Sequence, residues 1–291
     1  MRFVTVATKS SGYYEYLLQS CKRHNVHIDV LGLGMKWGGW VWRMDLIRKY
    51  YESLEPDEIV CFIDAYDVII LQDSSVIEKR FLDTGARIVV AEDFNTEPVD
   101  EFIARMFMFG TCKNIRINAG TYIGYVSDIL WMLNTMCHLH NCDKDVTLDD
   151  QKMMTQLCSL VPYRFHIDTD RHIFLCICYR DDMRLAGISV DNQRQLLYKN
   201  TMDPCILHGA GKANLDSVIA KLGYDIDVMM TSQTVLWRTM MKQFMISTLA
   251  IVGLAVIGLV LFLVFQKQSK SQPLKISSGS KTPYALPHNA S

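Results

Sequence analysis

The sequence has 291 residues, of which 49% are hydrophobic, and its formal net charge at pH 7 is −1. This length suits one large domain or two small ones, and the apolar content is enough for a sizeable core. Because 30 basic residues are balanced by 31 acidic ones, the chain is not expected to bind nucleic acid through its overall charge. A nucleotide partner would need a local site.

The first part of the chain alternates β-rich runs with segments of helical spacing. In chain order the predicted elements are a strand at 3–7, a helix at 14–23, a strand at 27–33, a helix at 44–54, and strands at 58–63 and 88–91. The continuous apolar run at 58–63 is typical of a strand covered by helices on both faces. Strands that alternate with helices predict a mostly parallel, doubly wound α/β sheet.

Beyond residue 110 the pattern is less regular. The segment NAGTYIG at 118–124 interrupts apolar sequence with small residues, which indicates a close approach of the backbone to a ligand or a neighbouring strand. A helix led by residues 147–151 is expected next, followed by late strands at 165–168 and 205–207.

A long apolar segment at 244–265 contains no charged residue. At a rise of about 1.5 Å per residue, roughly 20 such residues span a ~30 Å hydrocarbon core, so we predict one transmembrane helix here. Residues 227–243 form a juxtamembrane linker that separates the helix from a domain at 1–226. Residues 266–291 have the composition of a disordered tail.

Two orientations in the membrane are open. No N-terminal segment resembles a signal peptide, and a span so close to the C-terminus favours tail anchoring with the domain in the cytosol. Basic residues are more numerous after the span than before it, which favours a lumenal domain instead. They are Arg238 and Lys242 before the span, and Lys267, Lys270, Lys275 and Lys281 after it.

The cysteines are nine in number, and Cys61 lies inside an apolar strand pattern. An odd count with buried positions favours free thiols in a reducing compartment over a disulfide framework. Cys137 and Cys142 enclose His138 and His140, but the usual spacing of a zinc site is missing.

Polar and glycine-rich segments follow the ends of the predicted strands. In doubly wound sheets, ligands bind outside the carboxyl ends of the strands. The segments at these ends are Thr8-Lys9, Gly34 to Gly39, Asp64 to Asp67 and Glu92-Asp93. We therefore expect the ligand site where these segments converge.

Asp64 and Asp67 carry the clearest chemistry among these segments. In an unbroken strand they would point to opposite faces, so the strand must end near Asp64 and turn. Two carboxylates gathered by this turn repel each other unless a cation lies between them. Hard oxygen ligands of this kind select Mg²⁺ or Mn²⁺. The alternative is that both aspartates only cap the next turn.

Several segments, taken in order, resemble the glycosyltransferase domain of the procollagen-lysine hydroxylases and the related glycosyltransferases of large DNA viruses. They are VTVATK at 4–9, LGLGMKWGG at 31–39, VCFIDAYDVI at 60–69, the strand into Ala91-Glu92, INAGTYIG at 117–124, DDQ at 149–151 and HGAGK at 208–212. The resemblance covers residues 2 to 226, the whole part before the linker.

What the resemblance implies is a GT-A fold, a single Rossmann-like domain that uses a UDP-sugar and Mn²⁺. Asp64 and Asp67 match the metal-binding aspartates of the family, and His208 matches its histidine ligand. A neutral imidazole suits Mn²⁺ better than Mg²⁺, which remains the alternative. Only the position of His208 before Gly209 and Gly211 distinguishes it from an ordinary loop histidine.

The resemblance also implies a set of donor-binding residues. Val6, Thr8, Trp37 and Tyr66 fall where the family holds the uracil and ribose, although Tyr66 would serve packing equally well. Gly209 and Gly211 belong to the segment that ends in Lys212. Lys212 is placed to meet the diphosphate, and Arg43 could do the same from the helix after Gly38-Gly39. Cation and metal would together stabilise the UDP leaving group.

Asp149 and Asp150 match the last two residues of an acidic run in the family. One would orient the donor sugar or act as a base towards the acceptor hydroxyl, and the alternative is that they only cap a helix. Asn118 and Gly120 would line the sugar pocket. The segments around Trp37, at 118–122 and at 93–98 depart from the family pattern, so the sugar and the acceptor stay open.

The sequence therefore predicts a metal-dependent glycosyltransferase that moves a hexose, galactose or glucose, from a UDP-sugar to a hydroxyl of hydroxylysine or of a glycan on a protein. The chain leaves no room for the dioxygenase domain of the family, so lysyl hydroxylation is not expected. The alternative is a non-catalytic membrane adaptor on a decayed nucleotide-sugar-binding fold. A phosphatase or phosphotransferase would favour D-x-D-x-[TV], which DAYDV does not supply. If the protein is viral, its membrane is that of the host or the virion.

Overall fold

The computed structural model describes residues 1–94, 102, 104–142, 148–178, 187–211, 213–226, 248–249 and 252–263. The chain divides into two compact units, Met1–Leu236 and Trp237–Ser291. The first unit contains every strand that the structure describes.

The first unit is built around a mixed sheet, which among the described residues has nine strands. Along the sheet their order is β2-β1-β3-β6-β5-β8-β11-β4, and β7 pairs with β5 outside this path. The strands are β1 (Arg2–Val6), β2 (Ile28–Leu31), β3 (Ile59–Ile63), β4 (Val68–Ile70), β5 (Ile88–Phe94), β6 (Ile117–Tyr125), β7 (His166–Asp168), β8 (Phe174–Cys178) and β11 (Ile206–Ala210). A separate hairpin is formed by β9 (Ile188–Val190) and β10 (Leu196–Tyr198).

The direction of the strands departs from the prediction in the centre of the sheet. β1 is parallel to β2 and β3, and β8 is parallel to β5 and β11. β6, however, is antiparallel to both β3 and β5. β5 ends and β6 begins at the same end of the sheet, where Asp93 N donates to Arg116 O at 2.9 Å. β4 is also antiparallel to its neighbour β11. The α/β sheet is confirmed, with antiparallel strands that the sequence pattern did not indicate.

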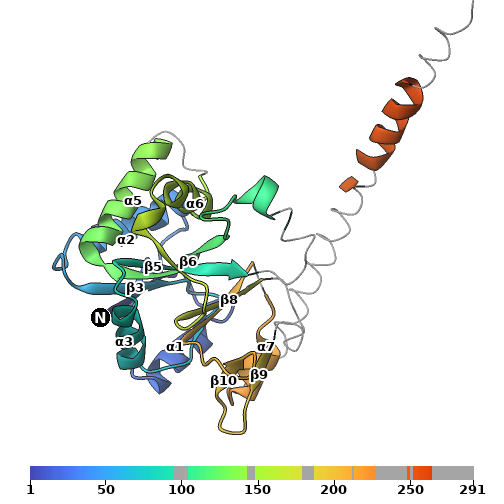
Figure 1. The fold of residues 1–291 in the computed structure, drawn as a ribbon. Helices are drawn as coiled ribbons and strands as arrows, with labels where there is room; N and C mark the ends of the chain where they lie inside the picture. The colour runs from blue at the N-terminus through green and yellow to red at the C-terminus, as the bar shows by residue number, and fades with distance from the viewer. Residues whose placement is uncertain are drawn as a thin grey trace, which may run out of the picture. The chain divides into compact units, whose positions relative to one another are not determined.

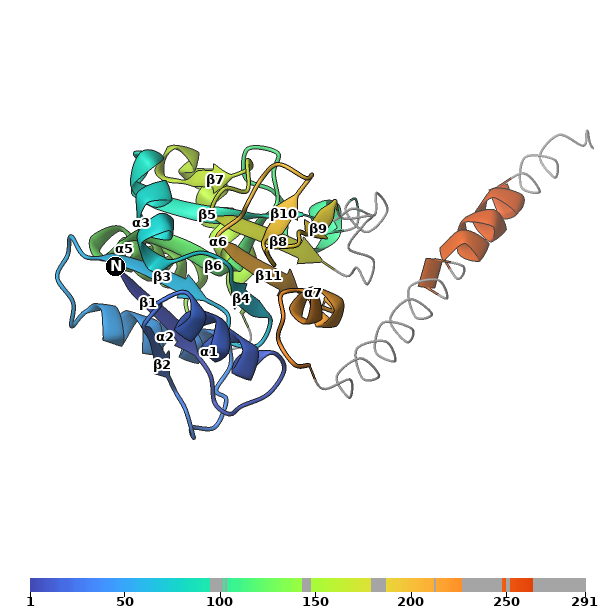
Figure 2. The same cartoon turned by 90° about the horizontal axis from the view of Figure 1, so that it is seen from below.

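Helices cover both faces of this sheet (Figures 1 and 2). They are α1 (Tyr14–Arg23), α2 (Trp40–Tyr51), α3 (Ser74–Asp83), α5 (Val126–His140), α6 (Asp150–Leu160) and α7 (Asp216–Lys221), with a π-helical turn at Ala104–Met108 and a 3-10 turn at Pro162–Arg164. Alternate residues of β3 supply the two core layers, as the two-residue period of a strand requires. Phe62 packs with Tyr51 of α2, whereas Cys61 packs with Leu17 of α1 and Phe81 of α3.

Most predicted element boundaries agree with the structure. α1 spans the predicted residues, and α2 begins at Trp40 rather than at residue 44 because Gly39, with φ of 94°, ends the preceding loop. NAGTYIG lies inside β6, where a Cβ on Gly124 would come within 2.6 Å of Arg87 O. The predicted close approach of backbone is confirmed there. β7 and β11 are the predicted late strands.

A disulfide joins Cys112, just before β6, to Cys158 on α6. The prediction of free thiols throughout is therefore wrong for this pair. The sequence could not reveal it, because the two cysteines are 46 positions apart and meet only when α6 packs beside β6. The other described cysteines lie outside this disulfide: Cys21, Cys61, Cys137, Cys142, Cys176 and Cys205.

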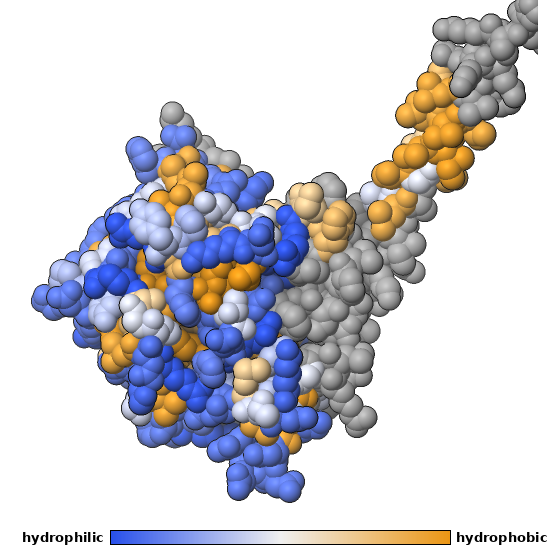
Figure 3. Space-filling view, viewed as in Figure 1, coloured by the Kyte–Doolittle hydropathy of each residue, from blue (hydrophilic) through white to orange (hydrophobic). Residues whose placement is uncertain are grey.

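In the second unit, residues 248–249 and 252–263 are helical, and their side chains are exposed. The apolar character of this stretch is visible in Figure 3. Within the described residues, no helix combines the length and the apolarity needed to cross a membrane. The predicted span at 244–265 lies partly outside the described residues, and the linker at 227–243 and the tail at 266–291 lie outside them entirely.

Candidate metal centre

Asp64, Asp67 and His208 come together at the edge of the sheet that the strand-end rule indicated. Asp64 directly follows β3, and Asp67 directly precedes β4, so a short turn gathers both carboxylates. His208 lies on β11 opposite Val68 of β4. Two backbone hydrogen bonds fix the turn: Asp64 N donates to Gly120 O at 2.8 Å, and Gly209 N donates to Asp67 O at 2.7 Å.

The geometry of these three side chains fits a divalent cation. His208 Nε2 lies 3.3 Å from Asp67 Oδ1 and 3.7 Å from Asp64 Oδ2, and one ligand atom from each residue lies within 4.8 Å of the others. His208 Nε2 is buried and has no hydrogen-bond partner of acceptable geometry among the described residues. A buried polar atom without a partner is costly unless a ligand satisfies it. Two carboxylates and one imidazole are a donor set that suits Mn²⁺.

Because Gly120 has no side chain, the side chains of Asp64 and His208 can lie directly against the backbone of β6. A Cβ at this position would lie 2.4 Å from both Asp64 Oδ2 and His208 Cε1. The backbone of β6 therefore forms the wall behind two of the three candidate ligands. Gly120 was predicted to line the sugar pocket, and the structure places it against two candidate metal ligands, Asp64 and His208.

The electrostatics of the cluster follow from burial and crowded charge. Desolvation raises the pKa of Asp64, Arg43 opposes this effect, and Asp67 adds to it. For His208, desolvation alone would lower the pKa, but Asp67 and Asp64 outweigh it and raise the pKa above the ordinary value. Asp64 and His208 therefore hold protons more tightly than isolated side chains would.

Arg43, from α2, is engaged inside the site. Its Nη1 donates to Asp64 Oδ1 at 2.5 Å, and its Nη2 donates to Asp150 Oδ2. The guanidinium is buried and lies over the rings of Trp40 and Phe62, 4.7 and 5.2 Å from their centroids. Burial alone would lower the pKa of Arg43, but Asp150 and Asp64 outweigh burial and raise this pKa above its ordinary value. Arg43 thus links a metal-ligand candidate to the start of α6, a role that the sequence did not indicate.

The two aspartates before Gln151 have different surroundings. Asp149 caps α6, because its Oδ1 accepts from Lys152 N at 2.9 Å, and desolvation raises its pKa. Asp150 is buried and pairs with Arg43. The capping alternative is therefore seen at Asp149, and a catalytic role of either residue stays a prediction.

A polar network that the sequence did not predict supports the same edge. Asn118 Oδ1 accepts from Gly120 N at 2.7 Å, and Asn118 Nδ2 donates to Gln151 Oε1 at 3.2 Å. Gln151 Nε2 in turn donates to Asp93 Oδ2 at 3.0 Å. Arg116 Nη1 also donates to this Asp93 oxygen, at 2.8 Å. Only the position of Asp93 at a strand end hinted at the network, since Arg116 lies in an unpatterned loop.

Hydrogen bonds bring several of the predicted nucleotide-binding segments together. Thr8 N donates to Tyr66 Oη at 2.9 Å, and Gly34 N donates to Thr8 O at 2.9 Å, so three strand-end segments meet. Tyr66 packs beside Tyr14, with ring centroids 6.4 Å apart. The side chain of Val6 is buried in the core.

The remaining predicted donor residues lie at two other places. Trp37 is 44% exposed and meets Trp40 and Trp42 edge-on, at centroid distances of 5.2 and 5.5 Å. A Cβ at position 209 would lie 2.9 Å from the Leu215 side chain, so glycine at this position allows Leu215 to pack closely against β11. Gly211, with φ of 63°, follows β11, and Lys212 lies outside the described residues.

Several known proteins are similar to this chain. Procollagen-lysine,2-oxoglutarate 5-dioxygenase of Drosophila melanogaster is 26% identical over 233 residues, which cover 74% of this chain and 31% of that protein. A multifunctional procollagen lysine hydroxylase and glycosyltransferase of Caenorhabditis elegans is 32% identical over 139 residues, 42% of this chain and 18% of that protein. The chain thus spans less than a third of the length of these curated relatives.

Among solved structures, the galactosyltransferase LgtC in complex with donor and acceptor sugar analogs matches with a TM-score of 0.45 and 14% identity, over 80% of this chain and 99% of that chain. A glycosyltransferase involved in the glycosylation of the major capsid of PBCV-1 matches with a TM-score of 0.42 and 11% identity, over 72% and 92%. The family model described as PLOD GT domain matches residues 1–235. Because this match covers most of the sequence, the chain belongs to the PLOD GT domain family.

Proposed function

We propose that this protein is a metal-dependent glycosyltransferase that moves a hexose, galactose or glucose, from a UDP-sugar to a hydroxyl acceptor. The observation that carries the proposal is the buried Nε2 of His208, which faces Asp64 and Asp67 and has no hydrogen bond of acceptable geometry within the described part of the chain. Family membership supports it, since a relative from Rattus norvegicus is named a multifunctional procollagen lysine hydroxylase and glycosyltransferase. An acceptor hydroxyl on hydroxylysine or on a protein-linked glycan is part of the proposal.

Asp64, Asp67 and His208 would hold the cation, and Mn²⁺ suits this set better than Mg²⁺. When bound, the cation would neutralise the charge that develops on the departing diphosphate. Arg43 positions Asp64 by a direct hydrogen bond, so this ligand needs little reorganisation when donor binds. Trp37, which is exposed on the loop after β2, provides an aromatic surface on which a base could stack.

Asp149 and Asp150 divide the remaining work. The carboxylate of Asp150 is committed to Arg43, which makes it a positioning residue. Asp149 lies at the N-terminal end of α6 and has a raised pKa, so we assign to it the orientation of the donor sugar or the removal of the acceptor proton.

Turnover of purified full chain with a panel of UDP-sugars, with and without Mn²⁺, tests the proposal. We expect UDP release that requires Mn²⁺, and a loss of at least about 100-fold in Asp64→Ala, because the transition-state charge loses its cation. Asp83→Asn, an exposed carboxylate on α3, is the matched control and should keep full activity. Full turnover by Asp64→Ala would refute the proposal. Binding of UDP-sugar without turnover of any donor would favour the non-catalytic adaptor.

We also propose that the apolar segment at 244–265 anchors the protein and that the domain faces an oxidising lumen. The Cys112–Cys158 disulfide supports this orientation over the cytosolic one, because disulfides persist mainly in oxidising compartments. The excess of lysines after the segment points the same way. Protease treatment of sealed microsomes should spare the domain, and its digestion there would contradict the proposal. Release of the protein by alkaline carbonate would exclude the anchor.

A further inference from the structure

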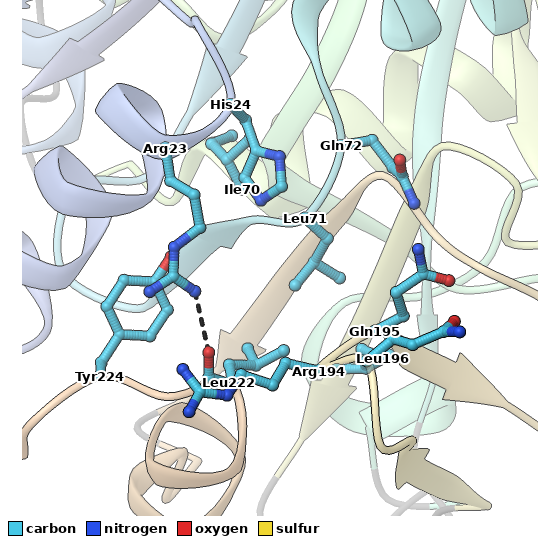
Figure 4. A pocket seen from close by; sticks show the side chains of 11 residues that line it. Arg23, His24, Ile70, Leu71, Gln72, Arg194, Gln195, Leu196, Leu222 and Tyr224 are labelled. Atoms are coloured by element: carbon cyan, nitrogen blue, oxygen red, sulfur yellow. Dashed lines mark hydrogen bonds between the residues drawn. The ribbon is translucent and has the colours of Figure 1, made fainter.

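A polar cavity of about 400 Å³ lies at the other end of the strands that carry the metal centre. β4 and β11 are antiparallel, and Val68 pairs with His208 at one end while Ile70, which lines the cavity, pairs with Ile206 at the other. The end of α1, the chain after β4, the β9–β10 turn and the chain after α7 surround it (Figure 4). This volume lies within the range of about 300–1,000 Å³ that small-molecule sites occupy.

Two guanidinium groups face this cavity, and the first, that of Arg23, is held in a fixed plane. Arg23 Nη1 donates to Leu222 O at 2.8 Å, which Figure 4 shows as a dashed line. The guanidinium lies over the ring of Tyr224, 3.8 Å from its centroid. A stacked and hydrogen-bonded arginine loses little freedom when it binds an anion.

The second guanidinium, that of Arg194, is held by close packing against the backbone. A Cβ on Gly223 would lie 2.3 Å from Arg194 Nη1 and 2.7 Å from its Cζ. Gly223 has φ of 85°, and Arg194 itself has φ of 64° in the β9–β10 turn. Among the described residues, no carboxylate forms an ion pair with Arg194, and none of the residues that line the cavity is acidic.

Three acidic residues lie close to the cavity lining in the chain: Asp73, Asp191 and Asp225. Asp225 is exposed and forms no ion pair with Arg23 or Arg194 in the described part of the chain. Asp73 Oδ1 lies 3.3 Å from His24 Nδ1. Asp191 Oδ1 accepts backbone hydrogen bonds from Gln193 at 2.9 Å and from Gln195 at 2.8 Å, which shape the turn. The positive charge of the cavity is therefore available to a ligand.

Three glutamine side chains complete the polar lining: Gln72, Gln193 and Gln195. In Figure 4 the amides of Gln72 and Gln195 lie on the same side of the cavity, across from Tyr224. An amide both donates and accepts hydrogen bonds, which matches the hydroxyl groups of a sugar. Apolar side chains, among them Leu71 and Leu196, also line the cavity and can contact the C–H face of a ring.

We propose that this cavity is a second binding site, which takes an anionic saccharide. The carboxylate, sulfate or phosphate of the ligand binds Arg194 and Arg23, because guanidinium groups match planar and tetrahedral oxyanions. The hydroxyl groups bind the three glutamines. The site is independent of the proposed transfer reaction, since it uses none of the residues of the metal centre.

Isothermal titration of the full chain in a neutral detergent, without metal or UDP-sugar, tests the proposal. The probes are a glucuronate-containing disaccharide, a sulfated neutral disaccharide, lactose, inorganic phosphate and a hexaglutamate peptide. We expect one or both acidic disaccharides to bind at one site per chain, and lactose to bind at least about tenfold more weakly, because it lacks the charge-assisted hydrogen bonds. The two acidic probes distinguish a carboxylate ligand from a sulfate ligand.

Arg194→Asn removes the charge while keeping a residue that tolerates positive φ, and it should weaken binding at least about tenfold. Lys22→Gln, on α1 but outside the cavity lining, makes the same change in net charge and should have no effect. Gln72→Ala, expected to weaken binding several-fold, is the second variant should Arg194→Asn alter the unfolding midpoint.

Four results would overturn the proposal: no binding of either acidic disaccharide, unchanged binding by Arg194→Asn, phosphate that binds as tightly as the disaccharides, or a peptide that binds more tightly. Because the titration contains no donor or metal, none of these results bears on the transferase activity.

Discussion

Among single residues, Arg43 has the most demanding surroundings in the metal centre. It is 6% exposed, it bridges Asp64 and Asp150, and its Nε atom has no hydrogen-bond partner among the described residues. Its charge is tolerated only because two carboxylates compensate it. Each carboxylate in turn depends on the guanidinium to compensate its negative charge.

Arg43→Gln should therefore lower the free energy of unfolding by about 3–5 kcal/mol, because it leaves the buried Asp150 and the partly buried Asp64 uncompensated. Urea denaturation at pH 7 measures this change. Arg48→Gln, on the same helix but paired with the half-exposed Asp45, is the control and should cost less than about 1 kcal/mol. An equal loss of unfolding free energy in the two variants would show that the Arg43 bridge stabilises the fold no more than the Arg48 pair does. Added Mn²⁺ should restore part of the loss, because the cation also neutralises Asp64.

From the raised pKa of His208 we predict that metal binding at the candidate centre depends on pH. A protonated imidazole cannot bind a metal, so protons compete with the cation below the pKa of this group. Because Asp67 and Asp64 raise this pKa above the ordinary value of about 6.5, affinity should be full at alkaline pH and begin to fall while the pH is still above 6.5. Titration of Mn²⁺ binding by electron paramagnetic resonance between pH 5 and 9 checks this expectation. A constant affinity down to pH 5 would remove His208 from the site.

Sequence reasoning located these residues to different degrees. The strand-end rule led to Asp64 and Asp67, because an apolar strand followed by two close carboxylates is visible in the chain. His208 needed the family resemblance, since nothing local distinguishes it. The partners of Arg43 lie 21 and 107 positions away, so only the fold reveals them.

At the scale of elements, α6 carries much of the site and is tied to the rest of the fold at several points. Its first turn supplies Asp150 to Arg43 and Gln151 to Asp93, and the Cys112–Cys158 disulfide joins its last turns to the chain before β6. The antiparallel direction of β6 brings Asn118 and Gly120 beside these groups. A pattern of apolar residues predicts that a strand exists, but its neighbours and direction depend on long-range contacts.

Replacement of Cys112 and Cys158 by serine should destabilise the domain. For a separation of 46 residues, loop-closure entropy gives about 4 kcal/mol as the loss, with smaller values if the unfolded chain keeps structure. Guanidinium denaturation of this variant, compared with the oxidised protein and with the half-buried single variant Cys137→Ser, measures the effect. An unchanged midpoint would contradict a stabilising disulfide. At moderate denaturant concentrations, turnover should fall by a larger fraction than the folded population does, because α6 carries Asp149 and Asp150.

At the scale of the whole first unit, the two ends of the sheet differ in charge. One end gathers carboxylates around His208, and the other gathers guanidinium groups and amides around the cavity. The alternation of strands and helices predicted the layered fold and the carboxylate end. The cavity could not be predicted, because it is formed by four short segments whose sequences carry no shared pattern.

Gly120 also bears on the choice among divalent ions. The wall behind Asp64 and His208 is main chain of a central strand, which cannot retreat as a flexible side chain can. Ca²⁺ requires roughly six to eight oxygen ligands at about 2.3–2.6 Å, a wider and more oxygen-rich cage than two carboxylates and one imidazole provide. A small ion that accepts nitrogen therefore keeps the advantage even where calcium is far more abundant, as it is in secretory compartments.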